Sequence, residues 1–146
     1  MSTSPAMHRE AFNILCHSLI YTGMSRAVWD SKVLPDCVIK VEETSGMFQN
    51  VVEWETWQRV KDTPMSRWFA ECRWISPNGS VLIMERTKPA SDDRYPEKMP
   101  AFLSDFKRRN YGMIGEFLVC HDYGTNMLFE HGMTKRLVKA NWTDGA

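Results

Sequence analysis

Residues 105–124 read DFKRRNYGMIGEFLVCHDYG, and this stretch places a polar unit on each side of an apolar run. The first unit extends from Asp105 to Asn110, and the second begins at Asp122, just before a tyrosine and a glycine. The apolar run predicts a strand at residues 116–121, so that Asp122 lies where the strand ends. A carboxylate beside a flexible glycine at a strand end is well placed to bind magnesium.

The first unit also carries residues that suit phosphate chemistry. Asp105 can accept a proton from a hydroxyl group, and the amide oxygen of Asn110 can bind a metal ion. Lys107 can neutralise charge on a phosphate that is being transferred. Taken alone, these residues leave a simpler interpretation open, in which Asp122 caps a turn, Asp105 ends a helix and the cations form a solvated face.

A lysine that needs an anionic partner lies upstream. Residues 37–42 predict a strand with Lys40 beside apolar neighbours, and residues 47–61 predict a helix that carries Glu53 and Glu55. A half-buried lysine requires a counter-charge, and we favour Glu53, because it shares one helix face with Asn50 and Trp57. The alternative is a surface salt bridge that contributes little. Three apolar residues are expected on the buried side of this helix: Phe48, Val51 and Val52.

Hydrophobic periodicity and turn residues predict the other elements. We expect a capped amphipathic helix from Ser4 to about Tyr21 that ends near Gly23, and a hairpin turn at Asn78 and Gly79. Further strands are expected at 25–30, 69–75, 80–87 and 134–140, a short helix at 101–107, a linker at 88–100 and a loop at 108–112. This order predicts a single α+β domain, residues 1–146, with an antiparallel sheet and packed helices.

Composition limits the functional classes. The 146 residues are 43% hydrophobic, and 18 basic residues balance 18 acidic ones. A neutral chain has no global field for nucleic acid or anionic membranes. This balance argues against a minor alternative, nucleic-acid binding through Lys107, Arg108, Arg109, Lys135, Arg136 and Lys139.

Targeting and cysteine patterns point to a cytoplasmic protein. No apolar run reaches the ~20 residues of a membrane span, and the start of the chain lacks the pattern of a secretory signal. The four cysteines are scattered without zinc-ligand spacing. They are predicted to be reduced and mostly buried.

The order of these units resembles the protein-kinase-like superfamily. Residues 37–40, CVIK, resemble its Val-Ala-Ile-Lys strand, and DFKRRN at 105–110 resembles its catalytic loop. DYG at 122–124 is similar to its Asp-Phe-Gly motif. The strand at 81–84, followed by Glu85, resembles the strand that leads to the family's hinge. Gly23 has a counterpart in the glycine-rich loop.

The resemblance implies a kinase N-terminal lobe with a minimal catalytic-loop segment, and Mg-ATP as the cofactor. It also implies roles for eight residues: Gly23 in the phosphate loop, Lys40 on the α- and β-phosphates, Glu53 holding Lys40, backbone at Glu85 near adenine, Asp105 as the base, Lys107 on the transferred phosphate, and Asn110 and Asp122 as magnesium ligands.

Two functional hypotheses follow. The first is a minimal kinase-like enzyme that binds Mg-ATP and transfers or hydrolyses its terminal phosphate. The second is a catalytically inactive scaffold, a pseudokinase, that binds and modulates a protein. Three departures from the kinase pattern favour the second hypothesis. Tyr21 and Arg26 occupy two positions where the glycine-rich loop has glycine, and Leu103 and Ser104 replace the His-Arg pair before the catalytic aspartate. Few residues follow Gly124. Six tryptophans and ten methionines can supply a contact surface, although they can equally fill the core.

A looser resemblance concerns the small kinase-like proteins of tailed bacteriophages. It implies a phage-encoded protein in the cytoplasm of an infected bacterium, with a host or phage protein as its partner.

Overall fold

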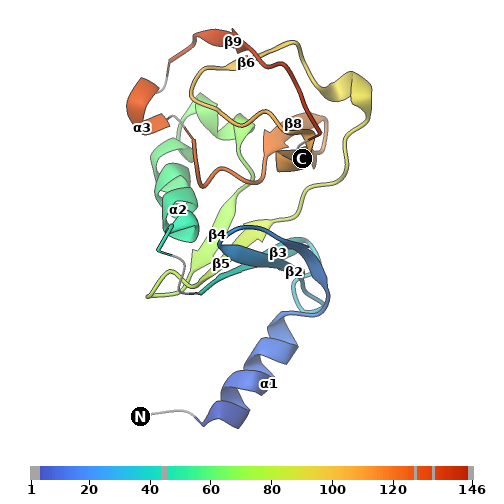
Figure 1. Cartoon of the computed structure of the whole chain (residues 1–146), viewed down its shortest axis with the longest axis vertical. Coiled ribbons are helices and arrows are strands. Elements are labelled where there is room, and N and C mark those ends of the chain that lie inside the picture. Colours follow the sequence, from blue (N-terminus) through green and yellow to red (C-terminus); the bar gives the residue numbers. More distant parts are fainter. Residues whose placement is uncertain (1–3, 44–45, 127, 133, 145–146) are drawn as a thin grey trace.

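The computed structural model describes residues 4–43, 46–126, 128–132 and 134–144, and shows an α+β fold. Its centre is a five-stranded antiparallel sheet with the strand order β1-β2-β3-β5-β4 (Figure 1). The strands are β1 (Leu19–Thr22), β2 (Arg26–Asp30), β3 (Cys37–Glu42), β4 (Cys72–Ile75) and β5 (Val81–Glu85). The predicted α+β class and antiparallel sheet are therefore confirmed.

The β4–β5 hairpin turns where its sequence predicts. Gly79 has a φ of +78°, a left-handed conformation that glycine adopts without steric cost. The side chain of Asn78 accepts a hydrogen bond from the amide of Ser80 at 3.1 Å, which closes the turn. The hairpin places β5 beside β3, so the central strand that carries Lys40 has neighbours on both sides.

Helix α2 (Gln49–Val60) lies against this sheet, but with the opposite face from the one expected. Phe48 and Val51 are exposed, whereas the buried residues are Asn50, Glu53, Thr56 and Val60. The prediction of an apolar buried face was wrong, because the sheet presents charged groups here. The Glu42 carboxylate accepts hydrogen bonds from the amides of Gln49 (2.9 Å) and Asn50 (2.8 Å). These bonds fix the start of the helix with its polar face toward the sheet.

The remaining elements form a second layer beyond the sheet (Figure 1). It contains one hairpin, β7 (Tyr111–Ile114) with β8 (Phe117–Cys120), and one pair, β6 (Lys98–Pro100) with β9 (Leu137–Lys139). Short helical turns complete the layer: η1 (Pro64–Trp68), η2 (Asp92–Arg94), η3 (Arg108–Asn110) and α3 (Leu128–His131).

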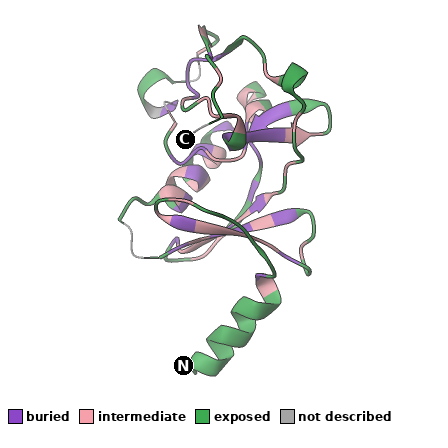
Figure 2. Ribbon diagram, turned by 45° about the vertical axis from the view of Figure 1, so that its right-hand side comes forward, coloured by how far each residue is buried: buried purple, intermediate pink, exposed green. Residues whose placement is uncertain are grey.

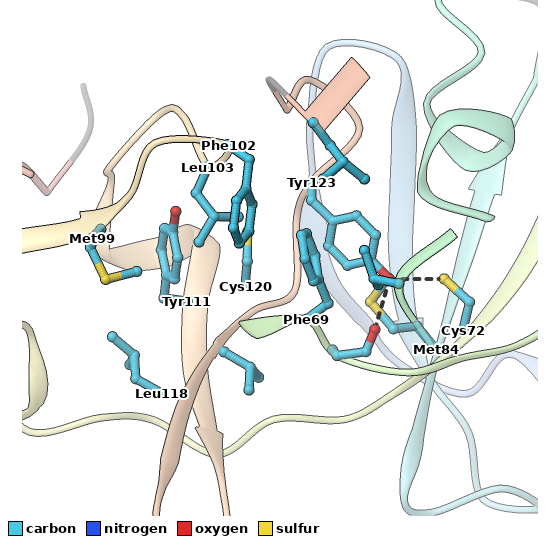
Figure 3. Packing of buried hydrophobic residues seen from close by; sticks show 14 of the residues in the cluster. Phe69, Cys72, Met84, Met99, Phe102, Leu103, Tyr111, Leu118, Cys120 and Tyr123 are labelled. Atoms are coloured by element: carbon cyan, nitrogen blue, oxygen red, sulfur yellow. Dashed lines mark hydrogen bonds between the residues drawn. The ribbon is translucent and has the colours of Figure 1, made fainter. Parts of the chain in front are cut away.

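The core joins the two layers. The ring of Phe69 stacks on Phe102 at 5.8 Å and meets Tyr123 edge-on at 4.9 Å (Figure 3). The hydroxyl of Tyr123 donates to the carbonyl of Ala70 at 2.7 Å and lies 3.1 Å from the thiol of Cys72. Tyr123 is thus a buried anchor that fixes the residue next to Asp122.

Two sequence predictions fail in this layer. Residues 101–107 were expected to be a helix but are irregular, because Asp105 has a φ of +54° and the backbone of Lys107 pairs with Thr143. The expected loop at 108–112 contains η3 and the start of β7. Gly112 permits this strand, since a Cβ there would lie 2.3 Å from the hydroxyl oxygen of Thr87.

The expected N-terminal helix is also shorter than predicted. Helix α1 (Pro5–Leu15) begins at the predicted Ser4 cap but ends before the strand β1, which the helical prediction had absorbed. Helix α1 has no buried residue and projects away from the body (Figure 2). Its Phe12 contacts Trp29 edge-on at 5.2 Å. Across the described residues, no helix combines the length and the hydrophobicity needed to cross a membrane.

Candidate functional site

The predicted pair of Lys40 and Glu53 is present and buried. The Nζ of Lys40 on β3 lies 2.8 Å from the Oε1 of Glu53 on α2, with side-chain exposures of 3% and 0%. Glu55, the alternative partner, is exposed. Removing two charges from water is costly, and the cost is offset only when each charge finds several partners. Lys40 finds a second one in the backbone carbonyl of His121, just before Asp122.

Arg26 is the second cation of this network. Its Nη1 lies 2.9 Å from Oε1 of Glu53 and its Nη2 lies 2.6 Å from Oε2, a bidentate contact. Its Nη1 also donates to the side chain of Asn50 at 2.9 Å, and its Nη2 reaches Oδ1 of Asp122 at 3.1 Å. Arg26 is the first residue of β2, so it connects the β1–β2 turn to the end of β8.

The charges of this network shift the pKa values of Glu53 and Arg26. Burial of Glu53 would by itself raise the pKa of its carboxyl group, but the charges of Arg26 and Lys40 outweigh that cost and lower the pKa to about 2. Burial likewise opposes the charge of Arg26, but Glu53 and Asp122 raise its pKa above the usual value. Both groups therefore stay ionised, and Glu53 is a fixed anion between two fixed cations.

Asp122 is the member of the network that meets solvent. Its side chain is 33% exposed, whereas Arg26 is 4% exposed. The amide of the next residue, Tyr123, donates to Oε2 of Glu53 at 2.7 Å. Backbone contacts on both sides thus tie the turn after β8 to the Lys40–Glu53 pair, and they leave the Asp122 carboxylate at the open edge.

His121 fixes the same turn from its other side. Its Nε2 donates to the carbonyl of Arg109 at 2.7 Å, and its Nδ1 accepts from the hydroxyl of Thr87 at 2.6 Å. Burial lowers the pKa of His121, and the charge of Lys40 acts in the same direction. The imidazole is therefore a neutral connector between β8, the segment after β5, and η3.

The predicted catalytic loop has a defined shape. The Nδ2 of Asn110 donates to both the backbone carbonyl and Oδ2 of Asp105, each at 3.1 Å. The Nζ of Lys107 lies 3.5 Å from Oδ1 of Asp105. Asp105 is held in a left-handed conformation, a local strain that occurs often at functional sites. The loop therefore presents a partly exposed carboxylate with a cation beside it.

A backbone hydrogen bond joins this loop to the charge network. The amide of His121 donates to the carbonyl of Asn110 at 2.9 Å, next to the pairing of Tyr111 with Cys120. Through this bond, Asn110 adjoins the turn that carries Asp122. Hydrogen bonds to the backbone of His121 thus link Lys40 on β3 and the loop that ends at Asn110 to the turn that carries Asp122.

The two predicted magnesium ligands, Asn110 and Asp122, each carry an oxygen of the kind that magnesium prefers. The amide nitrogen of Asn110 faces Asp105, which leaves its oxygen as the end that can bind a cation. Among the described residues, no group of three His, Cys, Asp or Glu side chains is arranged to hold a metal. Magnesium commonly takes one or two carboxylates and completes its shell with phosphate oxygens and water.

Two further predicted residues lie at the margins. Gly23 is in the β1–β2 turn, where an added Cβ would lie 3.2 Å from the ring of Tyr21. Glu85 ends β5, and its amide donates to the carbonyl of Glu71 at 2.8 Å. Because the amide of Glu85 already donates this hydrogen bond, an adenine ring near Glu85 would have to contact other backbone groups.

Two surface pockets occur elsewhere in the described part of the chain. The larger, about 300 Å³, lies between the start of α2 and the β4–β5 turn, with Phe48 and Ser80 in its wall. The smaller, about 190 Å³, lies beside η1 and β8, with Trp57 and Phe117 in its wall. Neither is lined by Lys40, Asp105 or Asp122.

The chain matches no known protein family and no curated protein. Its function must therefore be inferred from the geometry of this site.

Sequence reasoning missed the most connected residue of the site. Arg26 was noted only as an interruption of a glycine pattern, yet it contacts Asn50, Glu53 and Asp122. The available signal was the arginine's place in a predicted strand next to the Lys40 strand, since a buried arginine requires carboxylate partners. No role was predicted for His121, and its position as a connector depends on contacts with Thr87 and Arg109 that no local pattern encodes.

The four cysteines behave as predicted. All are free and buried. Burial raises the pKa of Cys16 to about 11 and that of Cys72 to about 12, so these thiols are protonated at neutral pH and are poor nucleophiles.

Proposed function

We propose that this chain is a minimal protein-kinase-like domain that binds Mg-ATP and transfers its terminal phosphate. One observation carries the proposal: Lys40, Glu53 and Asp122 belong to one network although they come from β3, α2 and the end of β8. In protein kinases, a lysine on the third strand pairs with a glutamate on the next helix, near a magnesium-binding aspartate. The same order of residues and a lysine–glutamate pair support the proposal, and Asp122 joins this pair through Arg26.

The proposed chemistry assigns distinct tasks to the two ends of the site. Lys40 would bind phosphate oxygens, and Asp122 with Asn110 would hold a magnesium ion that would offset phosphate charge. Asp105 would accept the proton of the acceptor hydroxyl. The oxygen of that hydroxyl would bond to the terminal phosphorus, and the bond between this phosphorus and the ADP oxygen would break. Lys107, 3.5 Å from Asp105, lies where it can stabilise charge on the transferred group.

A thermal-shift titration tests nucleotide binding. Wild-type protein with Mg-ATP at 100 times Kd should gain about 2.7 kcal/mol of stability by mass action, a rise of several degrees in Tm. Lys40→Ala and Asp122→Asn should lose most of that rise. The matched control is Glu55→Gln, which removes the charge of a carboxylate on the solvent-exposed face of α2. An unchanged wild-type Tm up to millimolar Mg-ATP would reject the proposal.

A second candidate is the inactive protein-binding scaffold, and a different observation favours it. Arg26 already neutralises both Glu53 and Asp122, so the network is satisfied without a ligand. At the other end of the molecule, α1 and β1 expose apolar side chains that a partner can cover: Met7 (60%), Ile14 (62%), Leu19 (51%) and Ile20 (48%).

The two candidates predict opposite results. The scaffold requires that Mg-ATP leaves the Tm of the wild type unchanged and that Ile14→Ser and Leu19→Ser abolish capture of a partner protein. The enzyme requires a nucleotide-dependent Tm, and it requires that the same two surface substitutions leave nucleotide binding intact.

A further inference from the structure

The β1–β2 turn offers few donors to an anion. The amide of Gly23 donates to the carbonyl of Arg26 at 2.8 Å and so closes the turn. The hydroxyl of Ser25 donates to Oε2 of Glu42 at 3.0 Å. These groups hold the hairpin and the start of α2 together. The next residue, Arg26, is therefore the main cationic group that this turn directs toward Asp122.

The contacts of Arg26 are unequal. Its contact with Glu53 is bidentate, at 2.9 and 2.6 Å, with a carboxylate that is fully buried. Its contact with Asp122 is single, longer at 3.1 Å, and involves a carboxylate that is 33% exposed. A ligand that enters at the exposed edge would exchange the Asp122 contact and leave the Glu53 contact in place.

Charge balance gives the exchange a direction. The two cations, Arg26 and Lys40, pair with the carboxylates of Glu53 and Asp122, and the buried Glu42 also acts on Arg26 through its charge. When the Asp122 carboxylate turns to a divalent cation, Arg26 loses one of its two ion-pair partners. A phosphate oxygen restores the balance, and a guanidinium is well suited to bind it because it offers paired donors.

We propose that Arg26 is a phosphate-binding residue that exchanges Asp122 for a nucleotide phosphate. The inference rests on the proposed nucleotide site and adds a coupling to it. Without a divalent cation, Asp122 occupies Arg26 and repels the phosphates, so metal-free nucleotide binds poorly. With magnesium on Asp122, Arg26 is released toward the phosphate, so metal and phosphate bind as one unit.

The coupling predicts that substitution of Asp122, a proposed metal ligand, increases the affinity for metal-free ATP. Asp122→Asn removes the competing charge and frees Arg26. In the presence of EDTA, the affinity of this variant for metal-free ATP should therefore exceed that of the wild type by a factor of about ten or more. Magnesium should then add little. Calorimetric titration of ATP, with and without magnesium, measures both affinities, and Glu55→Gln, on the exposed face of α2, serves as the control that should behave like the wild type.

A double variant assigns the gain to Arg26. Arg26→Gln combined with Asp122→Asn removes one cation and one carboxylate, so Lys40 and Glu53 remain as a pair of opposite charges. This variant should lose the gain in metal-free ATP affinity. Circular dichroism and Tm verify that each variant is folded.

The outcomes separate the inference from the function on which it rests. If the wild type binds Mg-ATP but Asp122→Asn gains no affinity for metal-free ATP, the exchange is wrong and the nucleotide site stands. The exchange is also wrong if the double variant retains the gain. If neither protein binds ATP under either condition, the nucleotide site itself is wrong.

Discussion

The Nη2 of Arg26 lies 3.1 Å from Oδ1 of Asp122, although the two residues are 96 positions apart in the chain. This contact joins the first turn of the sheet to the turn that follows β8. It lies beside the bidentate contact of Arg26 with Glu53, so the two carboxylates share one guanidinium. The site thus gathers the cations Arg26 and Lys40 around the carboxylates of Glu53 and Asp122, and we propose that a ligand displaces the Asp122 contact.

Loss of Glu53 should be strongly destabilising. Glu53→Ala leaves Arg26 and Lys40 buried without their common anion, and breaking a buried ion pair from one side costs about 3–5 kcal/mol. Urea denaturation measures the free energy of unfolding. Glu55→Ala, on the exposed face of the same helix, should change it by no more than about 0.5 kcal/mol. Equal effects of the two variants would show that the network contributes nothing to stability.

Acid should weaken the fold through Glu53 in a defined pH range. Its pKa is about 2 in the folded state against an ordinary value of 4.5, so its contribution to stability is complete above pH 4.5. The contribution is lost as the pH falls from about 4.5 toward 2, because the unfolded chain then binds the proton first; the total loss is about 3 kcal/mol. Urea denaturation at several pH values should give a flatter profile for Glu53→Gln. Parallel profiles would contradict the assignment.

Asp105 should be required for transfer and not for binding. Asp105→Asn removes the proton acceptor, and general bases typically contribute 10²–10⁴-fold, so phosphoryl transfer should fall by about that factor. Binding of Mg-ATP should stay within about twofold, since Asp105 is assigned no phosphate contact. Rapid-quench assays with labelled ATP measure transfer, and calorimetry measures binding. Full activity in this variant would remove Asp105 from the chemistry.

Tyr123 should be needed for the position of Asp122. Tyr123→Phe leaves the buried carbonyl of Ala70 without its donor, which costs about 1–3 kcal/mol. The exposed Tyr21→Phe should leave stability within about 0.5 kcal/mol. Thermal denaturation of the two variants checks the difference. A neutral Tyr123→Phe would mean that the hydroxyl does not anchor the turn.

The sequence indicated the Lys40–Glu53 pair because the pair depends on local rules. Lys40 lies in a strand with apolar neighbours, and the spacing of Asn50, Glu53 and Trp57 marks one helix face. The same rules predicted the apolar residues of that helix on the buried side, and this was wrong. The charged groups of β2 and β3 decide which face turns inward, and this depends on tertiary contacts such as that of Arg26 with Asn50, 24 residues apart in the chain.

Other misses have the same origin. The strand β1 follows α1 closely, and its apolar residues continue the helical stripe, so periodicity alone could not separate the two elements. The strand β7 needs the close approach of Gly112 to Thr87, which is a tertiary contact. The irregular segment before Asp105 follows from the pairing of Lys107 with Thr143 near the other end of the chain.

The most direct test of the account uses a paramagnetic probe. Manganese can replace magnesium beside ATP, and it broadens the amide signals of residues near it in nuclear magnetic resonance spectra. The account predicts that Mn-ATP broadens the signals of Lys40, Asn110 and Asp122 together, and that Asp122→Asn removes this common effect. Broadening confined to other acidic residues, or none at saturating Mn-ATP, would contradict the claim that these three segments form one nucleotide site.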